Sequence, residues 1–442
     1  MANTDGVTAY SRFGLGARQG DLARIGSDPR GALKAEIADP HVAVIHGKDL
    51  PDTVAALTAV RDRQMARKAG TLDKAKMAKP MLIEYRARIA QAKRAEIGFG
   101  ERLAAFWANH FAIESDAGAL VRGLAGAYER EAIRPNILGK FEDLLLAATR
   151  HPAMLAYLNN ATSIGPDSKA GERRDRGLNE NHAREIMELH TIGVDGGYTQ
   201  ADVIALAKIL TGWSFGQSEK QPKRFGRFAF NPRAHEPGAE TLMGVKYSQA
   251  GEKQGEAALA FLAQAPATAT HIATKLVRHF VADVPPQPLV DGLAKVFMDT
   301  GGDLKAVSTA LVDADAAWQA PASKLRTPQE FLWASVRALD AKLPPQLAQR
   351  SLTALGQPLW NPPSPEGFHD DTATWLAPDA MTNRLDAAQL LAQRTDIDDP
   401  RLLAADLFGD ALSANTKQAI ARAESPQQGL SLLLMSPEFQ RR

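Results

Sequence analysis

Residues 178–213 read LNENHAREIMELHTIGVDGGYTQADVIALAKILTGW and predict two consecutive helices. In the first half, apolar residues recur at spacings of three and four, as they do on one face of a helix. Gly193 is a natural left-handed stop for that helix. Thr199, with Asp202 three residues later, forms a variant of the capping box and opens a second helix toward Gly212. Helices joined by so short a turn usually pack as an antiparallel pair, so the segment favours a helical fold.

The same apolar spacing recurs almost from end to end of the 442 residues. Hydrophobic residues make up 45% and charged residues 23%, which are ordinary globular values and exclude wholesale disorder. The formal net charge of +1 gives no whole-chain argument for binding nucleic acid or an anionic membrane. The chain has no cysteine, which excludes disulfides, thiolate catalysis, Cys-ligated zinc and iron–sulfur clusters.

We therefore expect a mostly α-helical protein, one large multi-helix body with a small β-hairpin insertion near residues 225–247. Residues 227–230 (RFAF) alternate like a strand, and residues 244–247 (GVKY) are the expected partner strand. A Pro-rich loop should lie against the body, because its tryptophans are costly to leave in water. Along the chain we distinguish an N-terminal helical region, 1–160, with a basic helical hairpin at 53–97; a central helical region, 161–320; and a C-terminal helical region, 321–442, with the Pro-rich loop at 357–379.

The hairpin is more basic than the chain as a whole. Between residues 61 and 96, eleven Lys and Arg residues stand against four Asp and Glu residues, a local balance of +7. This pattern fits either a patch for an anionic polymer or a solvated helical hairpin. We favour the solvated hairpin, because Tyr85 is the one aromatic residue of the run and single-stranded nucleic acid needs a stacking platform. No nucleic-acid partner is predicted.

Carboxylates cluster on one side of the first helix of the 178–213 segment. At about 100° per residue, Asn181, Glu185 and Glu188 fall within a narrow arc, opposite the apolar face. On one interpretation this arc is the solvated side of an amphipathic helix. On the other it is buried, so the two carboxylates repel and one holds its proton at neutral pH. Enzymes prepare a general acid beside a general base in this way.

Other chemical signatures are weak. His182 and Glu185 place two possible metal ligands on adjacent turns, but no second Glu-x-x-His copy completes a di-iron site, so we predict no metal or other cofactor. The chain has no P-loop, and Gly14-Leu15-Gly16 lacks the third glycine of a dinucleotide site. The start of the sequence has neither the basic residues nor the apolar run of a secretory signal, and no stretch predicts a membrane span. On this basis we expect a soluble, cytoplasmic protein.

Several motifs, taken together and in order, resemble a bacterial family catalogued as domain of unknown function eighteen hundred. The resemblance covers nearly the whole chain, and its most specific part is the stretch that begins at Asn179. It implies no settled activity; the family's members are often exported and commonly sit beside genes of a sulfatase-like family, which implies a possible envelope protein partner. Two departures from the family are an imidazole at His182, where an aromatic residue is usual, and the missing export leader. The motifs are RFGLG (12–16), FWANHF (106–111), residues 178–213, GQP (356–358) and PPSPEG (362–367).

The resemblance favours a buried polar site, because Glu recurs at fixed positions of the family pattern. We hypothesise a hydrolase of a polar, glycan-like polymer, with Glu185 and Glu188 as acid and base or nucleophile and with tryptophans, Trp375 among them, stacking on sugars. The first alternative is a non-enzymatic binding or accessory protein of the cell envelope or export machinery, in which a Glu–Arg–His network is a structural lock. The second is a metal or haem site using His110 and His190. The candidate catalytic residues are Glu185, Glu188, His190 and His110; the candidate substrate-binding residues are Arg12, Trp107, Asn109, Glu180, Arg184 and Trp213.

Overall fold

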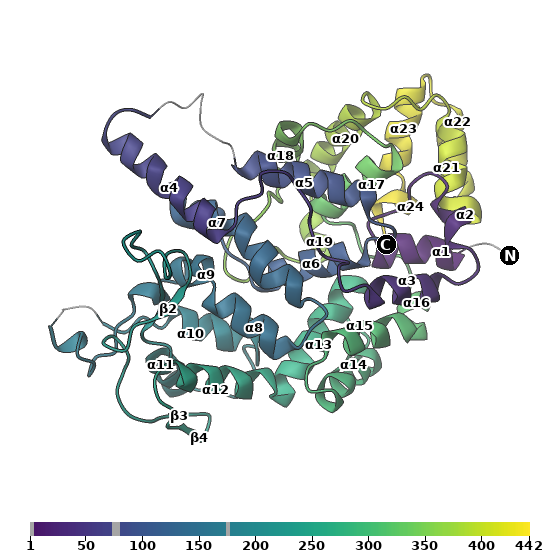
Figure 1. The fold of residues 1–442 in the computed structure, drawn as a ribbon. Helices are drawn as coiled ribbons and strands as arrows, with labels where there is room; N and C mark the ends of the chain where they lie inside the picture. The colour runs from purple at the N-terminus through teal and green to yellow at the C-terminus, as the bar shows by residue number, and fades with distance from the viewer. Residues whose placement is uncertain (1–3, 73–79, 174–176) are drawn as a thin grey trace.

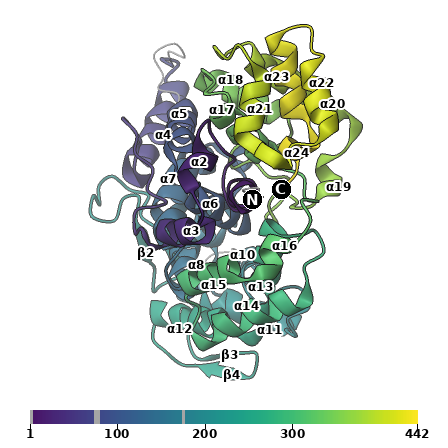
Figure 2. The same cartoon turned by 90° about the vertical axis from the view of Figure 1, so that its right-hand side faces the viewer.

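The structure is a computed structural model that describes residues 4–72, 80–173 and 177–442. Within these ranges the chain forms 24 α-helices, short π- and 3-10 segments, and two small two-stranded antiparallel sheets. Figures 1 and 2 show the helices packed around one another, with the strands at the edge of the body. The predicted fold class, a mostly α-helical protein, is confirmed. None of the described helices has the length and apolar character needed to cross a membrane.

The N-terminal region begins its longer helices where local signals predict. Asp28 caps α3 by accepting a hydrogen bond from Gly31 N, and Pro29 occupies the first helical position, where its missing N–H costs nothing. The elements are α1 (Thr4–Thr8), η1 (Ala9–Phe13), α2 (Asp21–Ile25), α3 (Pro29–Ala38), α4 (Thr53–Lys68), α5 (Pro80–Arg94), α6 (Phe99–His110), η2 (Ser115–Ala117), α7 (Ala119–Tyr128), η3 (Glu129–Ile133), η4 (Arg134–Asn136), α8 (Phe141–Arg150), α9 (Pro152–Tyr157) and η5 (Asn160–Thr162).

The predicted basic hairpin is two helices with different partners. α4 packs mainly on α7, whereas α5 packs on α17 (Pro328–Ala338) and α18 (Pro345–Ala354), and the two helices diverge in Figure 1. The far end of α4 is solvated, as 56% exposure of Met65 indicates. Within α5, by contrast, Arg88 is buried and paired with Glu84. The basic residues of this run are therefore only partly a solvated face, and those at 74–79 lie outside the described residues.

The central region contains the two consecutive helices predicted from residues 178–213. Gly193 has φ +82°, the predicted left-handed stop, and Thr199 and Asp202 form the predicted capping box of α11. One feature differs: the first helix continues as a π-helix, so its later residues do not keep the assumed α-helical spacing. The elements are η6 (Gly171–Arg173), α10 (Asn181–Glu185), η7 (Ile186–His190), α11 (Gln200–Ile209), β1 (Trp213–Phe215), β2 (Phe228–Phe230), β3 (Glu240–Leu242), β4 (Val245–Tyr247), α12 (Glu252–Ala263), α13 (Pro266–Phe280), α14 (Gln287–Asp299), α15 (Leu304–Asp313) and α16 (Asp315–Gln319).

The predicted pairing of the two strands in the insertion is wrong. β2 pairs with β1, and β4 pairs with β3, so the expected partners belong to separate sheets. The reason is a two-residue turn at Met243 (φ +49°) and Gly244 (φ +78°). A turn with positive φ at both central residues matches the twist of the flanking strands. Here it joins β4 to β3, the strand just before it in the sequence.

The C-terminal region contains the Pro-rich loop, which lies against the body as predicted. Trp360 and Trp375 are both buried. Thr327 and Glu330 form a capping box that opens α17, with Pro328 at the first helical position. The remaining elements are α19 (Thr372–Trp375), α20 (Pro378–Ala392), α21 (Pro400–Phe408), η8 (Gly409–Ala411), α22 (Ala414–Ala421), α23 (Pro426–Met435) and α24 (Pro437–Gln440).

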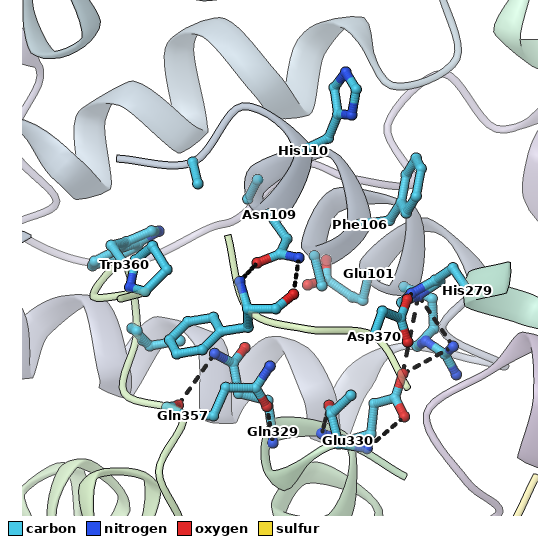
Figure 3. Close-up of a pocket in the computed structure, with 18 of the residues that line it drawn as sticks. Glu101, Phe106, Asn109, His110, His279, Gln329, Glu330, Gln357, Trp360 and Asp370 are labelled. Carbon is cyan, nitrogen blue, oxygen red and sulfur yellow. Dashed lines mark hydrogen bonds and ion pairs between the residues drawn. The ribbon is translucent and has the colours of Figure 1, made fainter. Parts of the chain in front are cut away.

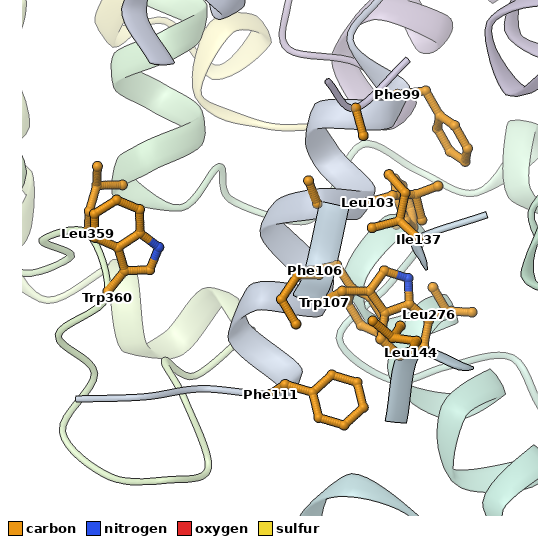
Figure 4. Close-up of a cluster of buried hydrophobic side chains, with 14 of the residues drawn as sticks. Phe99, Leu103, Phe106, Trp107, Phe111, Ile137, Leu144, Leu276, Leu359 and Trp360 are labelled. Atoms are coloured by element: carbon orange, nitrogen blue, oxygen red, sulfur yellow. The ribbon is translucent and has the colours of Figure 1, made fainter. Parts of the chain in front are cut away.

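Helix α6 crosses the hydrophobic core and fixes the position of the site. Phe99, Leu103 and Trp107 lie along its buried face, among side chains of α8 and α13 (Figure 4). Burying each large apolar side chain contributes about 1.5–3 kcal/mol, so this face holds the helix firmly. The opposite side of α6 carries Glu101, Ala105 and Asn109 at intervals of four residues, and this stripe lines a cavity.

Candidate functional site

A cavity of about 420 Å³ lies beneath the 357–371 loop. Its floor is the Glu101–Ala105–Asn109 stripe of α6, and its walls come from α13 and α17. Figure 3 shows side chains from all of these elements converging on it. The volume falls within the range of typical small-molecule sites, and both polar and aromatic groups line it.

Asn109 fixes the loop over the cavity. Its Nδ2 donates to the carbonyl oxygen of Phe368 at 2.9 Å, and Phe368 N donates to Asn109 Oδ1 at 2.8 Å. Gly367 has φ +92°, and a Cβ there would lie 2.5 Å from the carbonyl oxygen of Asn109. The end of the PPSPEG motif therefore requires glycine so that the loop can approach α6.

Trp360 forms part of one wall in a strained backbone conformation. Its φ is +51°, which a bulky residue adopts only where its surroundings enforce it, at a cost of about 1–3 kcal/mol. Its Nε1 donates to Glu129 at 2.6 Å, and the Arg88 guanidinium lies 4.3 Å from the ring centroid. Burial would raise the pKa of Glu129, but Arg88 and Arg134 outweigh it and lower that pKa to about 2. The Trp360 network comprises Glu84, Arg88, Glu101, Glu129, Arg130, Arg134 and Trp360.

A second buried network joins the opposite end of the loop to α13 and α17. His279 Nδ1 lies 2.5 Å from Asp370 Oδ2, and Arg102 Nη2 lies 2.9 Å from Glu330 Oε1. Glu330 also completes the capping box of α17, so the same carboxylate caps a helix and forms ion pairs. The His279 network comprises Arg102, His279, Lys324, Glu330, Asp370 and Arg442.

The hydrogen bonds of His279 determine its tautomer. Arg102 Nη2 lies 3.2 Å from His279 Nε2, and because a guanidinium only donates, Nε2 must be the acceptor. The ring proton is then on Nδ1 and is donated to Asp370. Burial lowers the pKa of His279 despite the favourable charge of Asp370, which agrees with a neutral ring. His279 is therefore a positioning residue whose two nitrogens are both engaged.

Two further imidazoles hold the carbonyl end of the π-helix. His110 Nε2 donates to the carbonyl oxygen of His190, and His271 Nε2 donates to that of Leu189, each at 3.1 Å. The structure thus brings the predicted residues His110 and His190 together, with ring centroids 6.0 Å apart. Burial lowers the pKa of both. No group of three His, Asp or Glu side chains positioned to hold a metal ion occurs in the described ranges.

The predicted carboxylates lie outside the cavity lining, half-buried on α10 and η7. Arg184 pairs with Glu180 at 3.0 Å and with Glu188 at 3.3 Å, and these three side chains are 27–35% exposed. The side chain of Glu185 has no hydrogen bond or ion pair with any residue that the structure describes. Burial and the charge of Glu188 raise its pKa. This is the direction predicted for one member of a repelling pair.

The remaining predicted site residues are structural in their contacts. Arg12 is buried and donates to the carbonyl oxygens of Ala317 at 2.5 Å and Ala320 at 2.7 Å, which ties η1 to the end of α16. Trp107 and Trp213 are 1% and 0% exposed, so neither presents a ring face to a ligand in this structure. Of the ten predicted residues, Asn109 and His110 line the cavity.

A family model described as a protein of unknown function, DUF1800, matches residues 8–441. The chain belongs to this family. No curated protein and no solved structure matches it. The DUF1800 match spans both the cavity and the half-buried carboxylates, so both are parts of the family domain.

Sequence reasoning missed most of the residues that line the cavity of this DUF1800 chain. Lys275 and His279 read as ordinary polar positions of an amphipathic helix, α13. Asp370 follows the PPSPEG motif in a run of titratable residues, His369-Asp370-Asp371, within a Pro-rich loop. Because loops carry functional residues more often than the elements they join, that run was the available signal.

Proposed function

We propose that the protein binds a polar ligand in the cavity beneath the 357–371 loop. The observation that carries this proposal is a cavity of about 420 Å³ whose walls are held by the Trp360 network and the His279 network. Side chains locked by buried ion pairs are pre-organised, so few protein groups have to be ordered when a ligand binds. The volume suits one sugar or amino-acid residue, including the end of a polar polymer such as a glycan.

Blocking the cavity tests the proposal. Ala105 lies on the floor with its side chain exposed, so Ala105→Phe adds bulk inside the cavity without replacing a core residue. Ala405→Phe, at an exposed position of α21, is the matched control. We expect small sugars, sugar acids or amino acids that raise the melting temperature of the wild type to have the same effect on Ala405→Phe and none on Ala105→Phe. Equal effects on both variants would contradict the proposal.

Hydrolysis of a polar polymer at Glu185 and Glu188 is the second candidate function. It is favoured by the raised pKa of Glu185 beside the Arg184-paired carboxylate of Glu188. A carboxyl group with a raised pKa can serve as the acid beside a second carboxyl group that acts as base or nucleophile. The test is turnover of a glycan panel by Glu185→Gln and Glu188→Gln, with the exposed Asp195→Asn as control. Wild-type turnover that survives both Glu substitutions would remove this candidate.

A further inference from the structure

Lys275 differs from the buried cations around the cavity because they have carboxylate partners and its side chain has none among the described residues. Arg102 has Glu330 at 2.9 Å, Arg134 has Glu101 at 2.8 Å, and Lys324 has Asp283 at 2.8 Å. The side chain of Lys275 lines the same cavity from α13, yet it makes no hydrogen bond or ion pair with any residue that the structure describes. An ammonium group that faces a cavity without a partner is an open position for an anion.

The ammonium group of Lys275 is partly shielded from solvent as well as unpaired among the described residues. Burial lowers its pKa to about 8, and the nearby charges of Glu366 and Asp370 oppose that shift without forming an ion pair among the described residues. Asp370 is already engaged by His279 and Lys324. Since a desolvated cation is costly, an anion bound in the cavity would recover free energy that the empty site does not.

The basic groups near Lys275 that form no ion pair with a described residue are three imidazoles and one exposed guanidinium, and none of them offers a desolvated positive charge. Burial lowers the pKa of His110, His190 and His271, so all three rings are neutral near pH 7. Arg278 also lines the cavity, but its side chain is exposed, and water solvates it. Among the described residues of the cavity lining, Lys275 is therefore the partly desolvated cation without a partner, and the neutral ring of His110 lines the cavity with it.

We propose that Lys275 is the anion-binding group of the cavity, and that the ligand presents a carboxylate or a phosphate to it. The inference rests on the proposed function of the cavity and narrows its ligand to an acidic one, such as a sugar acid or a phosphorylated sugar at the end of a polymer. A lysine binds such a group as a point charge, so either oxyanion can be accommodated.

Calorimetric titration with matched probes tests the inference. Galactose and galacturonate differ by a carboxylate, and inorganic phosphate represents the other oxyanion. Wild-type protein should bind galacturonate about tenfold more tightly than galactose, and Lys275→Gln should abolish that preference. Lys295→Gln is the control, because Lys295 is exposed and pairs within its own helix with Asp299. Circular dichroism establishes that each variant is folded.

A labelling experiment on the wild type avoids any substitution. Amine acetylation followed by mass spectrometry should modify Lys275, and phosphate or galacturonate should slow that modification and leave Lys295 unchanged. Equal affinity for galactose and galacturonate, both blocked by Ala105→Phe, would overturn the anion inference and preserve the ligand-binding cavity. Absence of binding and of protection with all three probes would overturn both proposals.

Discussion

Asp370 and His279 join the 357–371 loop to α13 through a contact of 2.5 Å between Oδ2 and Nδ1. The same loop is tied to α17 where Gln329 N donates to Gln357 Oε1 at 2.9 Å, and to α6 by Asn109. The loop is therefore fixed at its start by Gln357 and towards its end by Phe368 and Asp370. A loop held in this way shapes the cavity beneath it as part of the folded body.

Removing the tether at Asn109 should loosen the loop locally. Asn109→Ala deletes both hydrogen bonds to Phe368, and we expect it to destabilise the protein by about 1–2 kcal/mol. Hydrogen exchange measured by mass spectrometry should speed up in residues 365–371 before it does elsewhere. Asn383→Ala, which removes one exposed bond to Ala354, is the control and should leave that segment unchanged. Unaltered exchange in Asn109→Ala would mean that the tether is dispensable.

The buried histidines predict that the fold loses stability as the pH falls below about 6.5. Burial lowers the folded-state pKa of His110, His182, His190, His271 and His279, whereas the unfolded chain binds protons near pH 6.5. Below about pH 6.5 the unfolded state therefore takes up more protons, so the free energy of unfolding falls as pH falls. Each such group contributes at most about 1.4 kcal/mol per pH unit. Urea unfolding between about pH 7 and about pH 5 measures the slope, and a flat profile would contradict the assigned neutral rings.

Replacing His182 should stabilise the protein. Both of its ring nitrogens are buried without a hydrogen-bond partner in the described ranges, and burial lowers its pKa to about 3. His182→Phe removes an unsatisfied polar group, which should raise the free energy of unfolding by about 1 kcal/mol and reduce its dependence on pH. His46→Phe, at an exposed position, provides the comparison. A lower melting temperature for His182→Phe would indicate a partner for the imidazole.

A substitution at Glu188 can distinguish a structural role of this helix from a functional one. Because Glu188 and Arg184 are both partly exposed, their ion pair should contribute less than about 1 kcal/mol, and Glu188→Gln should melt close to the wild type. A loss of turnover or ligand capture in a variant of unchanged stability would favour chemistry at this helix. A fall of several degrees in melting temperature would instead favour the structural lock.

Local signals in the sequence predicted local structure well. The capping boxes at Thr199 and Thr327 are decided within four residues, so the starts of α11 and α17 were predictable. The partner strand of β2 was not predictable, because the pairing depends on Trp213, which lies before the insertion, and on a tight turn at Met243. The π-helix after Glu185 was also missed, because the angular argument assumed α-helical spacing throughout.

The site was less predictable than the fold, since its contacts join distant parts of the chain. Arg102 meets Glu330, and His279 meets Asp370, across spans of sequence that no spacing rule covers. Asn109 was selected as a motif residue, but its partner in the loop could not be read from one sequence. Lys275 carries no motif and becomes notable only once its lack of a partner is seen in three dimensions.

The most direct test of the central claim is a crystal structure of the protein soaked with galacturonate or phosphate. The account predicts electron density for the ligand beneath the 357–371 loop, within hydrogen-bond distance of Lys275. Ligand density beside Glu185, with only solvent beneath the loop, would contradict it.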